Sequence, residues 1–577
     1  MRILEVALVN LGGLWQGLRQ DFNLFEIALI AIGAWLWRRG RLPQFPRVRW
    51  PRRPWLAAVT IALGAMALRL ALIPVERVPI PIVTDEFSHL LLADTLLHGR
   101  VANPTHPYWQ FFESLHIVQQ PHYVSNYFPG HAAVLAAARM IFGNPWAGIL
   151  GECLAFLLVL YWALAGWMPA RWAMFGVLLA ALRFAIASYW INAYHGGFLP
   201  ALGGALVFGA FARLRRRATF GDSFVLGSGI AIVAMTRPFE GALYVAPMVA
   251  MLAWEYRRQA AALFRAFAPA LAITAAAVLA LGAYFERVTG SPFVTTYQIS
   301  QKTYGWPMGL AWTPPPKVEH RHIELQRYYD YELGEREKVD GPVDFVEFLT
   351  FRIQEYWRFF LGPVLTIPLF FVARVWRRRR VLFVAISGAM VAILLEGASS
   401  PHYLAPAAAV IIAILVECVR HLRAARVIDV GSLPAAMALV LVLRIGAQAT
   451  GLPYTQALNF QSWCCRVEGN LNKARVAAEL QRIPGKHLVF VKAKTDPNNL
   501  FQWIYNDADI DASRIVWARD LGAQRDAQLA AYFTGRSVWM VDPNVNPAIT
   551  NAWPIPSKLS SSIFSNSSRG ASAATTK

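Results

Sequence analysis

Two adjacent carboxylates, Asp85 and Glu86, open an amphipathic stretch that reads TDEFSHLLLADTLLHGR over residues 84–100. An uncharged linker joins this stretch to an apolar run long enough to cross a bilayer, so both acids are expected just outside the membrane. Adjacent side chains on a helix point about 100° apart, which predicts that the two acids divide their roles. Asp85 would face a cavity, while Glu86, with His89 on the same helix face, would bind a metal or orient a neighbour. Alternatively, Thr84 or Asp85 caps the helix and Glu86 complements its dipole.

Cationic side chains that can hold a phosphate stand at two further positions. Arg237, in TRPFEG over residues 236–241, breaks the pattern of arginines because it falls at an outer turn between two apolar runs. A charge in that place predicts a function, although a pair with Glu240 would also account for it. Lys302, the first lysine of the chain, stands among tyrosines and a tryptophan. This mixture suits phosphate and sugar contact, and the alternative is an ordinary exposed lysine.

Histidines and tyrosines form a third set of candidates. His195, in SYWINAYHGGFLP, and His402 with Tyr403, in EGASSPHYLAP, occupy tight outer turns close to the membrane. Tyr127 closes a stretch over residues 106–127 that mixes aromatic side chains with Gln, Asn and His, as sugar-binding surfaces often do. Each of these side chains can instead have a structural or interfacial role, because a loop at a membrane surface has the same composition.

The composition of the chain indicates the kind of structure that must position these residues. Of the 577 residues, 56% are hydrophobic and 16% charged, against about 25% charged in soluble proteins. This excludes a soluble enzyme and a disordered chain. The net charge of +20 lies in short basic clusters between apolar runs, which indicates membrane topology and no nucleic-acid partner. Four cysteines are too few for a disulfide framework, and the vicinal Cys464 and Cys465 are left open between a disulfide and two thiols.

About twelve apolar segments of roughly bilayer-spanning length are predicted. They lie near residues 21–37, 56–74, 147–167, 173–190, 198–213, 223–236, 240–255, 263–285, 357–375, 381–396, 403–419 and 432–449. The basic clusters, beginning with RRGRLPQFPRVRWPRR at residues 38–53, place alternate loops inside the cell. The outer segments then carry most of the acids, histidines and aromatic residues. The predicted fold class is an all-α polytopic membrane protein with a small C-terminal α/β domain.

Four regions are predicted along the chain. Residues 1–54 hold an N-terminal interfacial segment, the first span and the basic loop. A transmembrane core follows over residues 55–449, with large outer loops at residues 76–145 and 286–356. Residues 450–557 contain apolar strand-like runs at residues 487–493, 514–520 and 537–543, with a helical stretch before the last, which predicts the α/β domain. Residues 558–577, rich in Ser, Ala and Thr, are predicted to be a disordered tail.

The acidic loop resembles a known superfamily. An acidic pair on an amphipathic helix in the first outer loop, followed by YFPG at Tyr127 to Gly130, resembles the GT-C superfamily of integral-membrane glycosyltransferases. The resemblance is strongest to its bacterial protein-mannosyltransferase-like and RgtA/B/C/D-like branch, and rests on TDEFSHLLLADTLL and NYFPGHAAVLAA. The resemblance in the arrangement of spans and loops covers roughly residues 55–420. The span before residue 38 is an addition to the family pattern, and no second DxD-type pair is evident.

The resemblance implies an inverting glycosyltransferase that moves a sugar from a polyprenyl phosphate to an acceptor hydroxyl. The catalytic pair would be Asp85, as base, and Glu86, with His89 in support. A bacterial inner membrane is implied, with the site facing the periplasm and a lipid, polysaccharide or protein as acceptor. No cofactor is certain, and a divalent metal is left open. The residues expected to bind the donor phosphate and sugar are Arg237, Lys302, His402, Tyr403, Tyr127 and His195.

Two other functions stay open at this point. One is a lipid-linked-sugar flippase or another transporter, and the second is a non-catalytic envelope assembly protein whose C-terminal domain binds a partner. No P-loop, GxGxxG, CxxC or HExxH motif occurs, so nucleotide-driven transport, haem attachment and zinc-protease chemistry have no local support.

Overall fold

The computed structural model describes most of the chain. The predicted interfacial segment before residue 20, most of the basic loop at residues 38–53 and the tail at residues 558–577 lie outside the described residues. The described residues are 23–39, 51–305, 309–314, 316–335, 341–425, 430–452, 461–465, 467, 469–495, 502–545 and 549–553.

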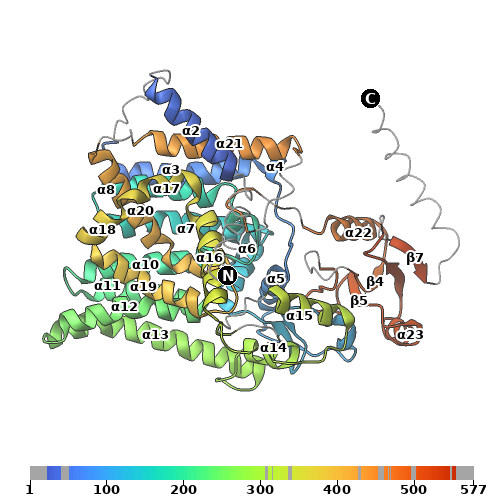
Figure 1. Cartoon of the computed structure of the whole chain (residues 1–577). Coiled ribbons are helices and arrows are strands. Elements are labelled where there is room, and N and C mark those ends of the chain that lie inside the picture. The colour runs from blue at the N-terminus through green and yellow to red at the C-terminus, as the bar shows by residue number, and fades with distance from the viewer. Residues whose placement is uncertain are drawn as a thin grey trace.

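A bundle of apolar helices forms the larger body of the protein (Figure 1). Its longer helices are α2 (Asn23–Arg38), α3 (Pro54–Ala71), α7 (Trp146–Ala165), α8 (Ala170–Ala180), α10 (Phe198–Leu214), α11 (Phe220–Ala234), α12 (Pro238–Tyr256), α13 (Ala260–Thr289), α16 (Pro342–Phe360), α18 (Val372–Arg378), α19 (Arg380–Leu395), α20 (Ala408–Ala424) and α21 (Ser432–Ala449). Shorter helical elements are α4 (Ile73–Glu76), η3 (Ala181–Ala185), α9 (Tyr189–Asn192), α17 (Gly362–Thr366), η4 (Ile367–Phe371) and η5 (Pro401–Ala407). Helix α10 is buried along most of its length and packs against α7, α11, α20 and η5.

Every predicted apolar segment overlaps a helix, so the helical and polytopic character is confirmed. Within the described residues, five helices are long and apolar enough to cross a membrane, and a sixth candidate is a bent pair. The number of twelve spans therefore stays a prediction. The predicted span at residues 357–375 is not a straight helix, because the chain bends by 100° at Gly362. This glycine has a φ of 62° and precedes Pro363, and both features interrupt a helix.

The predicted first outer loop, residues 76–145, folds into a compact unit between α4 and α7. Its elements are α5 (Thr84–Leu97), β1 (Asn103–Pro104), η2 (Trp109–Phe112), β2 (Ile117–Val118), β3 (His122–Ser125) and α6 (Pro129–Phe142), and its strands form a small antiparallel sheet in the order β1-β3-β2. The predicted amphipathic stretch at residues 84–100 forms α5, and α6 follows the YFPG segment. The second outer loop holds α14 (Thr296–Tyr304) and α15 (Ile323–Glu335).

The C-terminal segment forms a four-stranded sheet in the order β5-β4-β6-β7. Its elements are α22 (Leu471–Arg482), β4 (Lys486–Val491), β5 (Ile515–Arg519), α23 (Ala523–Tyr532), β6 (Arg536–Val541) and β7 (Ile549–Trp553). The central strand β4 runs parallel to β5 and β6, while β7 is antiparallel to β6. The three predicted strands and the helix before the last are confirmed, whereas α22 and β7 were not predicted. The vicinal pair left open by the sequence is a disulfide between Cys464 and Cys465.

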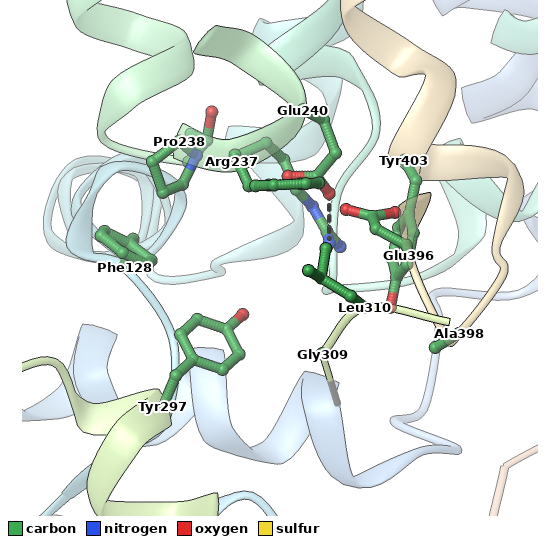
Figure 2. A pocket seen from close by; sticks show the side chains of 12 residues that line it. Phe128, Arg237, Pro238, Glu240, Tyr297, Gly309, Leu310, Glu396, Ala398 and Tyr403 are labelled. Atoms are coloured by element: carbon green, nitrogen blue, oxygen red, sulfur yellow. Dashed lines mark hydrogen bonds and ion pairs between the residues drawn. The ribbon is translucent and has the colours of Figure 1, made fainter. Parts of the chain in front are cut away.

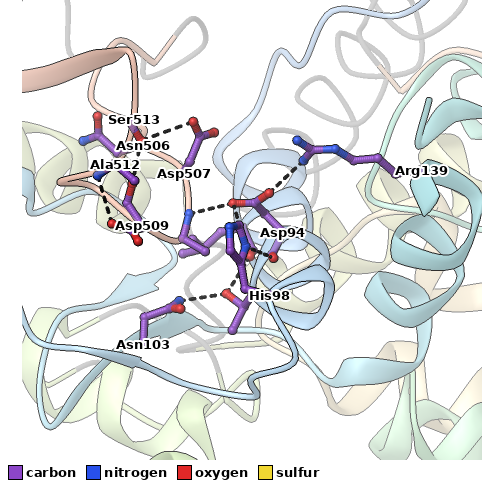
Figure 3. A network of polar contacts seen from close by, with 12 residues as sticks. Asp94, His98, Asn103, Arg139, Asn506, Asp507, Asp509, Ala512 and Ser513 are labelled. Atoms are coloured by element: carbon purple, nitrogen blue, oxygen red, sulfur yellow. Dashed lines mark hydrogen bonds and ion pairs between the residues drawn. The ribbon is translucent and has the colours of Figure 1, made fainter. Parts of the chain in front are cut away.

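The C-terminal sheet packs against the first outer loop (Figure 1). Leu91 on α5 and Phe111 on η2 share one apolar cluster with Leu488 and Phe490 of β4. Figure 3 shows the polar contact beside it, where the buried Asp94 accepts hydrogen bonds from two directions. Arg139 Nη1 of α6 donates to one carboxylate oxygen at 2.9 Å, and the backbone N–H of Ala508 donates to the other at 2.8 Å. The helix that begins at the acidic pair is thus held by the C-terminal domain.

We expect Asp94→Ala to lower the free energy of unfolding by about 2 kcal/mol, because it leaves a guanidinium and a buried amide without their acceptor. Thermal unfolding of the protein in lipid nanodiscs measures the loss. Asp94→Asn is the matched control, since it keeps an oxygen for the Ala508 amide and loses only the charge. Equal stability of the alanine variant and the wild type would contradict the docking role.

Candidate active site

Asp85 lies at the first turn of α5 and pairs with a histidine from the neighbouring loop. Its Oδ1 is 2.7 Å from Nδ1 of His116, and its side chain is 25% exposed. Burial alone would raise the pKa of the Asp85 carboxyl, but the charge and hydrogen bond of His116, assisted by His195 and Tyr127, lower this pKa well below the ordinary value. Asp85 is therefore a carboxylate at neutral pH, available to accept a hydrogen bond or a proton.

Glu86, next to it, has a different environment. Its Oε1 accepts hydrogen bonds from the backbone N–H groups of Ile82 at 2.9 Å and Val83 at 3.2 Å, and its Oε2 accepts one from Tyr194 at 2.8 Å. The side chain is buried and fastens the start of α5 to the turn that follows α9. Asp85 lines neither of the two cavities described below, so the predicted division of roles between the two acids stays a prediction. Glu86 orients backbone, and neither cavity described below includes it.

The pH dependence of stability should report on Glu86. Burial raises the pKa of Glu86 to about 7 from an ordinary value of 4.5. Between these two pH values the unfolded chain has lost a proton that the folded protein keeps, so this group makes stability fall as the pH rises from about 4.5 to about 7. We expect the unfolding temperature of Glu86→Gln to lack the part of the pH dependence that Glu86 contributes in the wild type. A difference between variant and wild type that stays constant from pH 5 to pH 8 would contradict it.

Arg237 comes from the turn between α11 and α12, where it precedes Pro238. A close backbone approach brings this turn to the acidic loop, because Gly130 of the YFPG segment donates its N–H to the Met235 carbonyl at 2.9 Å. A Cβ at Gly130 would lie 2.7 Å from that carbonyl oxygen, so only glycine fits. The guanidinium of Arg237 contacts Glu240 at 3.2 Å and lies over the Tyr403 ring, 4.4 Å from its centre.

Two cavities meet at Arg237. The larger has a volume of about 270 Å³, and Figure 2 shows Phe128 and Pro238 on one side of it with Glu396 and Tyr403 on the other. The smaller holds about 10 Å³, and its lining includes His89, Tyr127, His131 and His195. Phe128, Thr236 and Arg237 line both. Among the described residues that line these cavities, Arg237 is the only arginine or lysine.

Three histidines line the smaller cavity. Burial alone would lower the pKa of His131, but Glu152, 2.8 Å from its Nδ1, raises this pKa above the ordinary value. The other two differ from it. Burial lowers the pKa of His195 to about 4, and it also lowers the pKa of His89. Both side chains are buried and have an Nδ1 atom without a hydrogen-bond partner. His89 stacks on Tyr127 with ring centres 4.6 Å apart. His116, the partner of Asp85, has its ring centre 5.8 Å from that of Tyr127, so this cavity lies near Asp85, which itself lines neither cavity.

The other predicted residues differ in whether they line one of the two cavities. Tyr403 lines the larger cavity. His402 lies behind it, with Nδ1 3.0 Å from the Tyr189 hydroxyl and its ring centre 5.0 Å from that of His195. Lys302 is exposed on α14 and lines neither cavity, so the structure does not bring it to Arg237. Within the described part of the chain, no three His, Cys, Asp or Glu side chains are placed to hold a metal ion, and we assign none.

The sequence argument did not predict Glu396 or His116, and it noted Tyr297 only as one of the tyrosines around Lys302. Tyr297, five positions before Lys302, faces the larger cavity. Glu396, at the C-terminal end of α19, faces the same cavity and has a buried carboxyl oxygen without a hydrogen-bond partner. Glu396 is the first residue of the EGASSPHY segment, and it could have been noticed as a charge at the predicted membrane boundary. For His116, nothing local in the sequence distinguishes it from the other histidines of its loop.

No family model and no curated protein sequence matches the chain. Among solved structures, ArnT from Cupriavidus metallidurans in the apo state is 11% identical with a TM-score of 0.45, covering 86% of this chain and 96% of that one. ArnT bound to undecaprenyl phosphate gives 13% identity and a TM-score of 0.43, over 84% and 92% of the two chains. The oligosaccharyltransferase of Archaeoglobus fulgidus, tethered with an acceptor peptide, gives 13% and 0.41, over 76% and 62%.

ArnT is a GT-C glycosyltransferase, the superfamily that the first outer loop of this chain resembles. With TM-scores below 0.5, these similarities assign no role to any residue of the chain.

Proposed function

We propose that this protein is an inverting membrane glycosyltransferase that moves a sugar from a polyprenyl phosphate to an acceptor hydroxyl on the periplasmic face. One observation carries the proposal. A single guanidinium, that of the half-buried Arg237, stands where a cavity with apolar walls meets a smaller polar cavity, and the Asp85 carboxylate, paired with His116, lies on the polar side outside both linings. A lipid phosphate needs an apolar surface, a cation and a site for its sugar, in that order along the molecule.

The cation side of the site fits a phosphate. Arginine matches phosphate oxygens with two parallel hydrogen bonds, and its charge is worth most where water is excluded. The first prenyl unit would lie against Phe128, Pro238 and Phe239 of the larger cavity. Phosphate leaves as a stable anion, so the site needs no general acid. Charge developing on the leaving oxygen would be stabilised by Arg237.

The carboxylate side fits the acceptor. Asp85 would take the proton of the acceptor hydroxyl as its oxygen attacks the anomeric carbon, while the bond from that carbon to the phosphate oxygen breaks. Attack from the face opposite the phosphate inverts the configuration at that carbon. Tyr127, His89 and His195 would offer polar and aromatic surface to the sugar, and the cavity of about 10 Å³ among them would have to widen to admit it. In this scheme Glu86 fixes the helix that presents Asp85.

The buried charges of the helix bundle support a transporter less well than a glycosyltransferase. Arg69 donates to the backbone carbonyls of Glu76 and Arg77 and to the Asn192 side chain. Arg183 donates to the backbone carbonyl of Phe359 at 2.7 Å. These arginines within the helices thus bind backbone and amide groups, and they line neither cavity.

A panel of polyprenyl-phosphate sugars tests the proposal on protein in lipid nanodiscs. We expect one donor to raise the unfolding temperature, and the matching polyprenyl phosphate without sugar to compete with it. Lys302→Ala, at an exposed position outside both cavities, serves as the control and should respond as the wild type does. Folded protein that responds to no donor in the panel would count against the proposed function.

A further inference from the structure

Arg519 of the C-terminal domain contacts both outer loops at once. It is the last residue of β5, at the edge of the sheet where the carboxyl ends of the parallel strands β4, β5 and β6 meet. Its Nε donates to the backbone carbonyl of Glu113 in the first outer loop at 2.9 Å. Its Nη1 pairs with the carboxylate of Glu324 on α15, which lies beside the C-terminal sheet (Figure 1). Arg519 is buried, so this three-way contact is shielded from water.

The C-terminal domain binds both carboxylate oxygens of Glu324. Oε2 pairs with Arg519, and Oε1 accepts the backbone N–H of Lys494 at 2.5 Å, in the segment that follows β4. One turn further along α15, Nη1 of Arg327 donates to the Lys494 carbonyl at 3.0 Å. These contacts fasten the start of α15, and with it the second outer loop, to the carboxyl edge of the sheet.

Glu113 joins the two outer loops beside this contact. Its Oε2 lies 2.7 Å from Nε2 of His322 and 3.4 Å from Nε of Arg321, which immediately precede α15. The guanidinium of Arg519 holds the Glu113 carbonyl and the Glu324 carboxylate together. Its N–H donors form a planar, rigid fork, so one side chain fixes two partners at a set separation. Arg519 is therefore the point at which the C-terminal domain joins one outer loop to the other.

The two outer loops form neighbouring parts of the wall of the larger cavity. Phe128 belongs to the first outer loop and Tyr297 to the second, and both line this cavity with ring centres 5.7 Å apart. Leu325 of α15 packs against Tyr304, the last residue of α14, in one small apolar cluster. Tyr297 lies in the first turn of the same helix α14. A shift of α15 would therefore be passed along α14 to the cavity wall.

We propose that Arg519 is a positioning residue for the lipid donor, through which the C-terminal domain sets the separation of the two outer loops at the larger cavity. This role rests on the proposed function. Arg519 lines neither cavity, so it acts on transfer only through the loops. Without its contacts α15 moves more freely, the part of the wall formed by Tyr297 loosens, and the donor leaves sooner. The chemical step at Asp85 is unaffected while the donor is bound.

The first measurement follows the loops and needs no donor. Backbone hydrogen exchange reports the local opening of a segment, and it is read for α14 and α15 on protein in lipid nanodiscs. The informative variant combines Arg519→Gln with Glu324→Gln, because removing both charges leaves neither without its partner. We expect exchange in both helices to rise by about tenfold, the effect of losing a hydrogen bond between charged groups. If the double variant does not fold, Glu324→Gln alone, at a partly exposed position, should show a smaller rise.

The second measurement separates donor retention from chemistry. With the donor that stabilises the wild type, we expect the double variant to release it about tenfold faster. Single-turnover transfer at saturating donor should stay at the wild-type rate, because Asp85 and Arg237 are unchanged. Arg519→Lys keeps the charge and loses the fork, so its donor release should lie between those of the wild type and the double variant. A merely structural role of Arg519 would lower the transfer rate as well.

Arg514→Gln is the matched control in the same domain. Arg514 is exposed and donates to the carbonyls of Gln481 and Ile483, within the C-terminal domain. Its replacement should leave hydrogen exchange in α14 and α15 and the rate of donor release at the wild-type values. Wild-type exchange in the double variant would overturn the role of Arg519, and so would faster exchange with unchanged donor release. A wild type that binds no donor, whatever the exchange result, would overturn the proposed function, and donor positioning by Arg519 with it.

Discussion

Asp85→Asn should bind the sugar donor as the wild type does and transfer no measurable sugar. The substitution keeps the shape of the side chain and its hydrogen bond to His116 while it removes the carboxylate. A placed base is typically worth about 10² to 10⁴ in rate, so a loss of at least 100-fold is expected. Single-turnover transfer measures the rate, and the donor-induced rise in unfolding temperature measures binding on the same preparation.

Asp330→Asn, on the exposed face of α15, is a suitable control for the loss of one acid in the outer loops. It should leave both readings at the wild-type values. An Asp85→Asn protein that keeps more than about a tenth of the wild-type rate would show that Asp85 is not the base, given the usual size of such effects.

Replacement of Arg237 should weaken donor binding more than any other single change in the larger cavity. Arg237→Lys keeps the charge and loses the two-pronged contact, so the donor affinity should fall by about tenfold. Removing the charge should cost about 10- to 100-fold, the range expected for charge-assisted hydrogen bonds. Titration of the donor into labelled nanodiscs measures both effects.

Removal of the Arg237 charge needs a second substitution at Glu240. Arg237 is paired with Glu240, whose side chain is buried, so Arg237→Gln alone would leave an uncompensated carboxylate and could unfold the turn. The double variant Arg237→Gln with Glu240→Gln removes both charges together. Glu240→Gln alone should bind the donor at least as well as the wild type, because it frees the guanidinium. Unchanged donor affinity in the double variant would remove Arg237 from the site.

Sequence reasoning was most successful where local signals decide the structure. The length of the apolar segments predicted the helices, the amphipathic stretch after Thr84 predicted α5, and short apolar runs predicted strands β4, β5 and β6. Turn chemistry singled out Arg237, since a charge at an outer turn is visible without knowledge of the fold. The break at Gly362 was missed, because a glycine and a proline within an apolar run do not by themselves reveal a bend of 100°.

Contacts between distant segments could not be predicted in the same way. The link of Asp85 to His116 depends on how a loop of about thirty residues folds back over α5, and the link of Asp94 to Ala508 joins positions 414 residues apart. Lys302 shows how a local signal can mislead when the fold is unknown. Its neighbours in sequence suited a sugar site, but the helical turn of α14 directs Tyr297 to the cavity and leaves the lysine exposed.

The most direct test of the account follows the sugar itself. Wild type and Asp85→Asn, each in nanodiscs with the stabilising donor labelled in its sugar, are mixed with lipid and polysaccharide fractions of a bacterial envelope. The account predicts that the wild type releases polyprenyl phosphate and transfers the label to one acceptor class, and that Asp85→Asn binds the donor yet does neither. Label that stays on the donor with the folded wild type, across all acceptor fractions, would contradict the assignment of this site to glycosyl transfer.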